Sequence, residues 1–128
     1  MSTPIVIRKH KQFALFKYEN YPNPNIKLGT LVTYPKDENR IGVVIQTHDD
    51  GDFRTDMNGN TSMSEIRFST VNDVRKYRPD LLDLLPKQAL VDATIEEIKA
   101  DFAVHDETAI DELLKYIPNK NLIGYLRL

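Results

Sequence analysis

The chain of 128 residues contains no cysteine, and this absence excludes several kinds of chemistry. Without a thiol there is no disulfide, no thiolate nucleophile and no thiolate zinc site. Long apolar runs are also missing, since no stretch approaches the roughly 20 apolar residues that cross a bilayer. Residues 1–11 lack the apolar region of a secretory signal peptide. We therefore expect a cytoplasmic protein with no membrane contact.

Sequence signatures of enzymes are equally scarce. The chain contains no Walker-type glycine loop and none of the motifs G-x-G-x-x-G, G-x-S-x-G and H-E-x-x-H. His10, His48 and His105 lie in three different segments without a partner at metal-ligand spacing, so we expect each at the surface. The best acid–base group is His48 with Asp50 and Asp52, and hydrolase-type chemistry there ranks third among our hypotheses. We expect no catalytic residues, no metal and no cofactor.

Length and composition indicate one domain over residues 1–128. With 41% apolar and 28% charged residues, the chain has the composition of a folded globular protein rather than a disordered one. A chain of this length buries roughly two-thirds of its unfolded surface, which is enough for one core. We expect residues 1–68 to be mainly β, with a Pro/Asn loop at 21–25, and residues 69–128 to be mainly helical.

Strand and turn signals alternate over residues 28–68. Segments rich in β-forming residues at 30–34, 41–45, 53–57 and 66–68 are separated by Pro35, by the turn at 49–51 and by Asn58-Gly59. Because Asn-Gly favours positive φ at both central residues, we expect a type I′ hairpin turn there. Four strands joined by tight turns predict an antiparallel meander that coils into a small barrel. The segment Ile5–Ile7 is expected to pair with residues 13–16 or with a barrel edge.

This meander resembles SH3-like small barrels. Modules of that family bind proteins or RNA, or associate with ribosomes and polymerases, so the resemblance implies a binding role. It covers residues 28–68 and rests on turn chemistry. If the chain has an aromatic-lined groove for proline-rich peptides, Tyr34 and Phe53 are the candidates to line it.

After Phe68 the apolar period changes from two to about 3.6, which predicts helices. Thr70 with Asp73 forms a carboxylate version of the capping box, and Thr94 with Glu97 forms a full one that opens a further helix. Asp106 is a further N-cap signal. The three apolar stripes are Leu81–Leu85 before Pro86; Ile95, Ile98 and Phe102; and Ile110, Leu113, Leu114 and Ile117. The apolar tail, Ile123 to Leu128, is expected to dock as a short helix after Asn121 or as an edge strand.

Each apolar stripe spans only two or three turns, which is too short for a helix to be stable alone in water. We therefore expect these helices to cover the sheet. The alternative is that a stripe such as Leu81–Leu85 stays exposed and binds a partner or a second copy of the chain. A homodimer would then form through an apolar helix surface.

The acidic segment at residues 49–60 contains the main candidates for partner binding. Aligned with an EF-hand so that Gly59 is at position 6, it places Arg54 at position 1 and has strand-like flanks, so we expect no calcium site. On a strand, Asp52, Arg54 and Asp56 point to one side, which puts the guanidinium between two carboxylates. Such a stripe is either a recognition surface or the solvated face of the meander. The predicted partner-binding residues are Tyr34, Asp50, Asp52, Phe53, Arg54 and Asp56.

A basic, aromatic N-terminal arm supports a different function. Residues 1–36 contain six lysines and arginines but only one acidic residue, Glu19. Basic and aromatic side chains together supply phosphate contacts and stacking platforms in nucleic-acid binders. The candidates are Arg8, Lys9, Lys11, Lys17, Phe13 and Tyr18. Against this, Phe13–Tyr21 has the pattern of one more strand, and the net charge of −2 weakens attraction to phosphate.

These observations together favour an α+β protein whose meander or small barrel is followed by three or four short helices. We expect a non-catalytic binding or regulatory module that acts through protein–protein contacts. Nucleic-acid binding through the N-terminal arm is the alternative.

Overall fold

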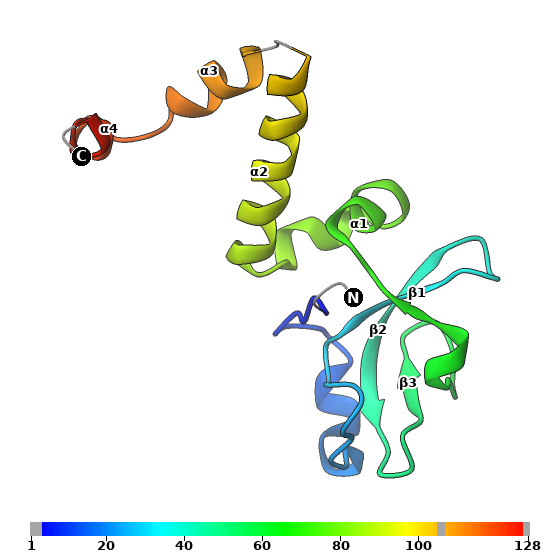
Figure 1. Cartoon of the computed structure of the whole chain (residues 1–128). Coiled ribbons are helices and arrows are strands. Elements are labelled where there is room, and N and C mark those ends of the chain that lie inside the picture. Colours follow the sequence, from blue (N-terminus) through cyan, green and yellow to red (C-terminus); the bar gives the residue numbers. More distant parts are fainter. Residues whose placement is uncertain (1–3, 105–106, 127–128) are drawn as a thin grey trace. The chain divides into compact units, whose positions relative to one another are not determined.

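Strands lie in the first half of the chain and α-helices in the second, so the predicted α+β class is confirmed (Figure 1). The structure, a computed structural model, describes residues 4–104 and 107–126, without the side chains of Lys17, Phe102, Ala109 and Tyr125. The predictions for His105, Asp106 and Leu128 therefore lie outside the described residues. The chain divides into two units, Met1–Leu90 and Val91–Leu128, which we describe separately. The expectation of a single domain stays a prediction.

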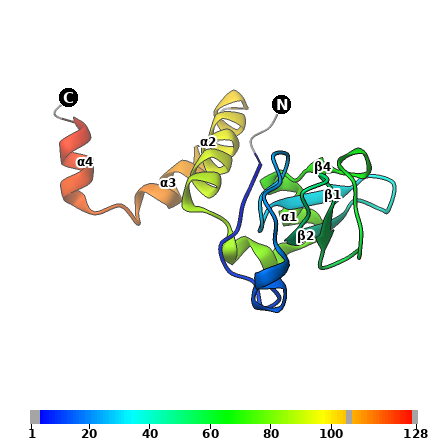
Figure 2. The same cartoon turned by 90° about the horizontal axis from the view of Figure 1, so that it is seen from below.

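The N-terminal unit contains a four-stranded antiparallel sheet in the order β3-β2-β1-β4. Its strands are β1 (Leu31–Tyr34), β2 (Arg40–Thr47), β3 (Phe53–Thr55) and β4 (Arg67–Phe68). The first three form the expected meander, but β4 returns to β1, where Val32 pairs with Phe68 (Figure 2). The sheet is open rather than closed into a barrel. Closure is prevented because the chain after β3 folds back, and a bridge between Phe53 and Thr61 occupies the β3 edge.

The Asn58-Gly59 turn differs from the prediction. Gly59 has no positive φ, so the turn is not of type I′. The Thr55 hydroxyl instead accepts hydrogen bonds from the amides of Met57 and Asn58, at 3.2 and 3.0 Å, and the Thr55 amide donates to the Asn58 carbonyl. A side-chain acceptor therefore closes the turn and makes left-handed backbone unnecessary.

Two apolar clusters lie on the two faces of the sheet. The first joins sheet residues to the N-terminal segment and to the helices α1 (Val71–Tyr77) and η3 (Pro79–Leu84), and it comprises Ile5, Ile7, Leu31, Ile41, Val43, Val74, Leu81 and Leu85. The second comprises Ile26, Val32, Tyr34, Val44 and Phe53. Helices therefore cover the sheet as expected, at α1 and η3. Leu81 and Leu85 are buried in the first cluster and Leu82 packs against it, whereas Leu84 is 38% exposed. The Leu81–Leu85 stripe is therefore mainly core, and the alternative of a wholly exposed stripe is wrong.

The N-terminal segment runs along the start of β1. Val6 bridges to Thr30, and the Ile7 amide donates to the Gly29 carbonyl at 2.9 Å. The segment therefore pairs with the start of β1, an inner strand, and neither with residues 13–16 nor with an edge strand. Gly29 has φ +89°, and a Cβ there would lie 2.1 Å from the Ile7 carbonyl oxygen. Only glycine permits this close approach of two backbones.

The segment predicted as a possible strand from Phe13 to Tyr21 is a 3₁₀ helix, η1 (Phe13–Glu19). Local bonds account for this, since the carbonyls of His10 and Gln12 accept from the amides of Phe13 and Leu15. Phe13 also packs against the first apolar cluster, so its burial does not require a strand.

The capping box at Thr70 and Asp73 is confirmed at the start of α1. The box predicted at Thr94 is wrong, because α2 (Lys87–Ala103) already begins after Pro86, whose carbonyl accepts from Ala89 and Leu90. The C-terminal unit takes in most of α2 together with α3 (Thr108–Leu114) and α4 (Asn119–Leu126), so the tail is helical. In the described part of the chain, no helix has both the length and the apolar character that a membrane span requires.

Candidate functional site

The structure does not gather the predicted partner-binding residues on one surface. Tyr34 and Phe53 are buried in the second apolar cluster, and the Tyr34 hydroxyl bonds to the hydroxyls of Thr55 and Thr61 at 2.8 and 2.9 Å. Asp50 is exposed at the β2–β3 turn, where its carboxylate accepts from the Asp52 amide at 3.0 Å. The two aromatic rings therefore contribute to the core, whereas Asp50 stabilises a turn.

Arg54 does not lie between two carboxylates. Its Nε donates to the Gly59 carbonyl at 3.2 Å, and its guanidinium lies 5.1 Å from the centre of the Phe16 ring. Strand β3 ends at Thr55, so the alternation of sides does not extend to Asp56. The carboxylate of Asp56 turns inward instead.

Asp56 is the centre of a buried polar cluster with His10 and Arg78. Its side chain is only 7% exposed, and its Oδ2 lies 2.8 Å from Arg78 Nη1 and 3.4 Å from His10 Nε2. Its Oδ1 accepts from the Val43 amide at 2.8 Å. One carboxylate therefore links the N-terminal segment, β2 and the end of α1. His10 is thus buried, contrary to the expectation that it lies at the surface.

The geometry of His10 favours a structural role over general base catalysis. Its Nδ1 accepts a hydrogen bond from the Gln12 amide at 3.1 Å, so the ring proton is on Nε2, which faces Asp56. Both ring nitrogens contact other groups of the protein, so neither is free to accept a proton from a substrate. The residues of the other acid–base group, His48, Asp50 and Asp52, lie in the turn between β2 and β3. Backbone hydrogen bonds close this turn, such as the one from the His48 amide to the Asp52 carbonyl.

A second ion pair joins β4 to the start of α1. Arg67 binds the Asp73 carboxylate through two nitrogens, at 2.6 and 2.9 Å. Hydrogen bonding from Arg67, with further bonds from Thr70, holds the pKa of Asp73 below its usual value despite partial burial. The same pairing raises the pKa of Arg67. This ion pair stabilises the start of α1, and that structural role is sufficient to explain its presence.

The basic arm is only partly assembled as a nucleic-acid surface. Arg8, Lys9 and Lys11 are exposed, and Tyr18 is 90% exposed on η1. Phe13 packs against the first apolar cluster, with its ring 5.5 Å from that of His10, so it offers no free stacking face. The side chain of Lys17 lies outside the described residues.

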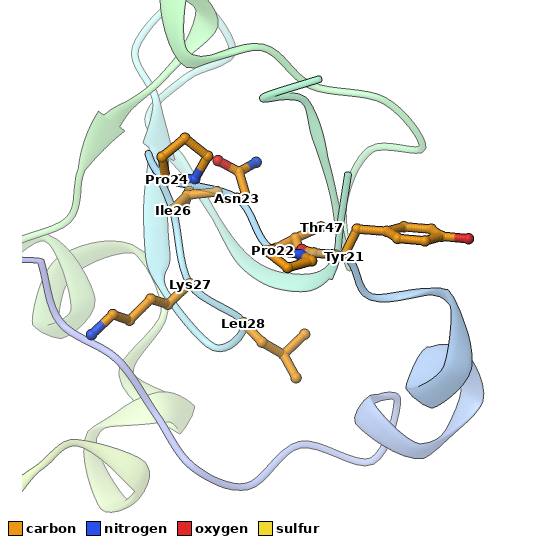
Figure 3. A pocket seen from close by; sticks show the side chains of 8 residues that line it. All are labelled: Tyr21, Pro22, Asn23, Pro24, Ile26, Lys27, Leu28 and Thr47. Atoms are coloured by element: carbon orange, nitrogen blue, oxygen red, sulfur yellow. The ribbon is translucent and has the colours of Figure 1, made fainter. Parts of the chain in front are cut away.

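A shallow groove of about 470 Å³ lies along the loop from Tyr21 to Leu28, a segment that the sequence indicated only as a connection (Figure 3). The loop is fixed to β2, because the Tyr21 amide donates to the Thr47 carbonyl and the Thr47 hydroxyl donates back to the Tyr21 carbonyl. Figure 3 shows the side chains of Tyr21 and Lys27 on opposite sides of the lining. The groove is therefore preformed, and its largely apolar lining suits an apolar side chain.

The C-terminal unit has a different surface. Of the described side chains in residues 91–128, none is buried. Leu113 is 41% exposed and Ile123 is 48% exposed, and further exposed apolar residues are Val91, Ile95, Val104, Leu114, Tyr116, Ile117 and Leu126. Of the apolar stripes predicted from the sequence, Ile95 and Ile98 lie on α2 and Ile110, Leu113 and Leu114 on α3, whereas Ile117 follows the end of α3. None of these side chains is buried in a core of this unit.

Within the described residues, no group of three or more His, Asp or Glu side chains is placed to hold a metal ion. Comparison with protein-family models, with curated proteins and with solved structures finds no match to this chain.

Proposed function

We propose that this protein is a non-catalytic binding module that acts through protein–protein contacts, with the C-terminal unit as its contact surface. The observation that supports this proposal is the absence of any buried side chain among the described residues of 91–128. A cytoplasmic location and the likeness to SH3-like binding modules, both expected from the sequence, belong to the same proposal.

The energetic reason is that α3 and α4 are too short to be stable alone. They comprise seven and eight residues, whereas isolated helices shorter than about 12 to 15 residues are marginal in water. Burying one Leu or Ile side chain completely contributes about 1.5 to 3 kcal/mol. Burial of several exposed side chains against a partner would therefore stabilise the helices and bind the partner at once.

The test compares two exposed apolar positions in the full chain. Leu113→Asp changes the C-terminal surface, and Tyr21→Asp changes the rim of the groove in the N-terminal unit. Partners captured from the native host are identified by mass spectrometry with each variant. We expect Leu113→Asp to lose the partners that the wild type and Tyr21→Asp retain. The reverse pattern would assign the contact to the groove, and equal capture by all three chains would contradict the proposal.

Nucleic-acid binding by the N-terminal unit is the second candidate, favoured by the exposure of Arg8, Lys9, Lys11 and Tyr18. Residues 1–90 contain thirteen basic and eleven acidic residues, a net charge of +2. Phosphate contacts would make such binding salt-dependent. A gel shift with RNA or DNA that disappears in the double variant Lys9→Glu, Lys11→Glu is the expected result, and no shift at low salt would remove this candidate.

A further inference from the structure

We propose that the C-terminal unit binds a basic amphipathic helix of another protein, an inference that depends on the proposed function. The first observation is the sign of the charge. Residues 91–128 contain eight acidic and four basic residues, a net charge of −4, whereas the rest of the chain is positive. A binding face with this charge attracts cationic partners and repels anionic ones.

The acidic side chains lie beside the apolar ones. On α2, Asp92 lies three residues before Ile95, and on α3, Asp111 lies three residues before Leu114, so each pair shares one side of its helix. Both carboxylates are exposed. Apolar and acidic groups are thus presented together, which is the complement of a helix with one apolar and one basic face.

Two lysines of the unit are already paired within it. Lys99 lies 3.8 Å from Glu96, and Lys115 lies 3.1 Å from Asp111 and 3.6 Å from Glu112. These ammonium groups reduce the local negative charge but do not reverse it, because acidic residues outnumber basic ones two to one. The unit as a whole therefore keeps its net negative charge.

The same charge argues against three other occupants. A second copy of the chain would bring another unit of net charge −4 to the interface, and like charges oppose that contact. Anionic lipid and nucleic acid are repelled for the same reason. A basic amphipathic helix is favoured by both apolar burial and charge, because it buries the leucine and isoleucine side chains and pairs with the carboxylates.

The spacing of the apolar residues fits a helical partner. On α3, Ile110, Leu113 and Leu114 are at positions i, i+3 and i+4, and on α2, Val91, Ile95 and Ile98 are separated by four and three residues. Helices that dock on one another use residues at these intervals as anchors. A flat sheet edge would use a period of two instead.

The experiment uses the full chain and two synthetic amphipathic peptides of about 18 residues, long enough to form a helix. One contains Leu and Lys at helical spacing, and the other contains Glu at every Lys position. Titration calorimetry is performed at about 50 and 300 mM salt, between which charge screening changes strongly. We expect the Lys peptide to bind, with at least about a tenfold loss of affinity at the higher salt, and the Glu peptide not to bind. Equal binding of both peptides, or binding that salt does not change, would overturn the inference.

Two variants locate the binding. Leu113→Asp should abolish binding of the Lys peptide, whereas Leu15→Asp, at a leucine that is 69% exposed on η1, should not. Asp111→Lys, three residues before Leu114 on the same side of α3, should weaken binding of the Lys peptide and leave the unfolding transition of the N-terminal unit unchanged. Loss of binding with Leu15→Asp but not with Leu113→Asp would also overturn the inference, because the peptide would then bind the other unit.

Sedimentation of the chain alone separates failure of this inference from failure of the proposed function. In one outcome, the Lys peptide does not bind but the chain dimerises. If this dimerisation is stronger at high salt and is absent in the Leu113→Asp variant, the surface serves self-association. The proposed protein–protein role then stands while the basic partner is wrong. If neither peptide binding nor dimerisation occurs, the basic partner is wrong, and the capture experiment decides whether the protein–protein role stands.

Discussion

The two units of this chain show what an apolar pattern does and does not determine. In the N-terminal unit, apolar residues from α1, η3 and the sheet meet in clusters whose central side chains are fully buried. In the C-terminal unit, stripes of the same residue types remain exposed on α2, α3 and α4. A stripe therefore predicts a helix, but only a second surface decides whether the stripe becomes core or a contact site.

The polar contacts differ in the same way. The Asp56 cluster and the Arg67–Asp73 pair of the N-terminal unit join segments that are distant in sequence or fix a helix terminus, and their carboxylates are largely buried. The pairs of the C-terminal unit, such as Lys115 with Asp111, join neighbours on one helix and are exposed. Only the first kind constrains the tertiary structure.

The largest expected effect comes from matched leucine substitutions. Leu31→Ala removes a fully buried side chain and should lower the free energy of unfolding by about 2 to 5 kcal/mol. Leu113→Ala removes an exposed one and should change it by at most about 0.5 kcal/mol. Urea unfolding followed by tyrosine fluorescence measures both. Similar losses in the two variants would remove the distinction between the units.

Matched glycine substitutions should give effects of opposite sign. Gly29→Ala places a methyl group against the Ile7 carbonyl at positive φ, and we expect a loss of about 2 kcal/mol or more. Gly124→Ala in α4 meets no atom within 4 Å and should favour the helix by about 1 kcal/mol. Thermal unfolding measures the first effect and circular dichroism the second. A stable Gly29→Ala chain would refute the close backbone approach.

Removal of a carboxylate should be costly only where the carboxylate is buried. Asp56→Ala removes the acceptor of the Val43 amide and the buried ion-pair partner of Arg78, and we expect a loss of about 2 kcal/mol. Asp111→Ala breaks an exposed pair with Lys115 and should cost at most about 0.5 kcal/mol. Chemical denaturation at neutral pH compares the two. If Asp56→Ala were as harmless as Asp111→Ala, the cluster would have no part in stability.

The smallest effect concerns pH. Because the pKa of Asp73 is lowered in the folded state, its ion pair stabilises the fold fully above the unfolded value of about 3.9. That contribution is lost as pH falls through the folded pKa. Asp73→Asn should therefore cost about 1 kcal/mol at neutral pH and converge with the wild type in acid. Asp83→Asn, at an exposed site, serves as the control. A difference that persists unchanged in acid would contradict the assignment.

The sequence predicted best those features whose causes are local. The Thr70–Asp73 capping box and the first three strands follow from residues that act on their own neighbours. The Asn58-Gly59 turn failed because the Thr55 hydroxyl supplied a different acceptor, and Phe13–Tyr21 failed because its apolar spacing suits a 3₁₀ helix as well as a strand.

The contact surface of the C-terminal unit was harder to predict, because it depends on the absence of a second element that would cover its apolar side chains. The stripe at Ile110, Leu113, Leu114 and Ile117 looks the same in the sequence whether it is covered or not. Burial of Leu81 and Leu85 and exposure of Leu113 are decided by neighbouring elements, and periodicity carries no information about them. Likewise, nothing next to Asp56 in the sequence indicates that Arg78 and His10 reach it.

Hydrogen exchange on the isolated chain tests the difference between the units most directly. We predict that the amides of β1 and β2 exchange only through global unfolding, whereas those of α3 and α4 exchange with little protection and become protected when the Lys peptide binds. If α3 and α4 in the chain alone were protected as strongly as β2, the C-terminal unit would be stable by itself and the central claim would be wrong.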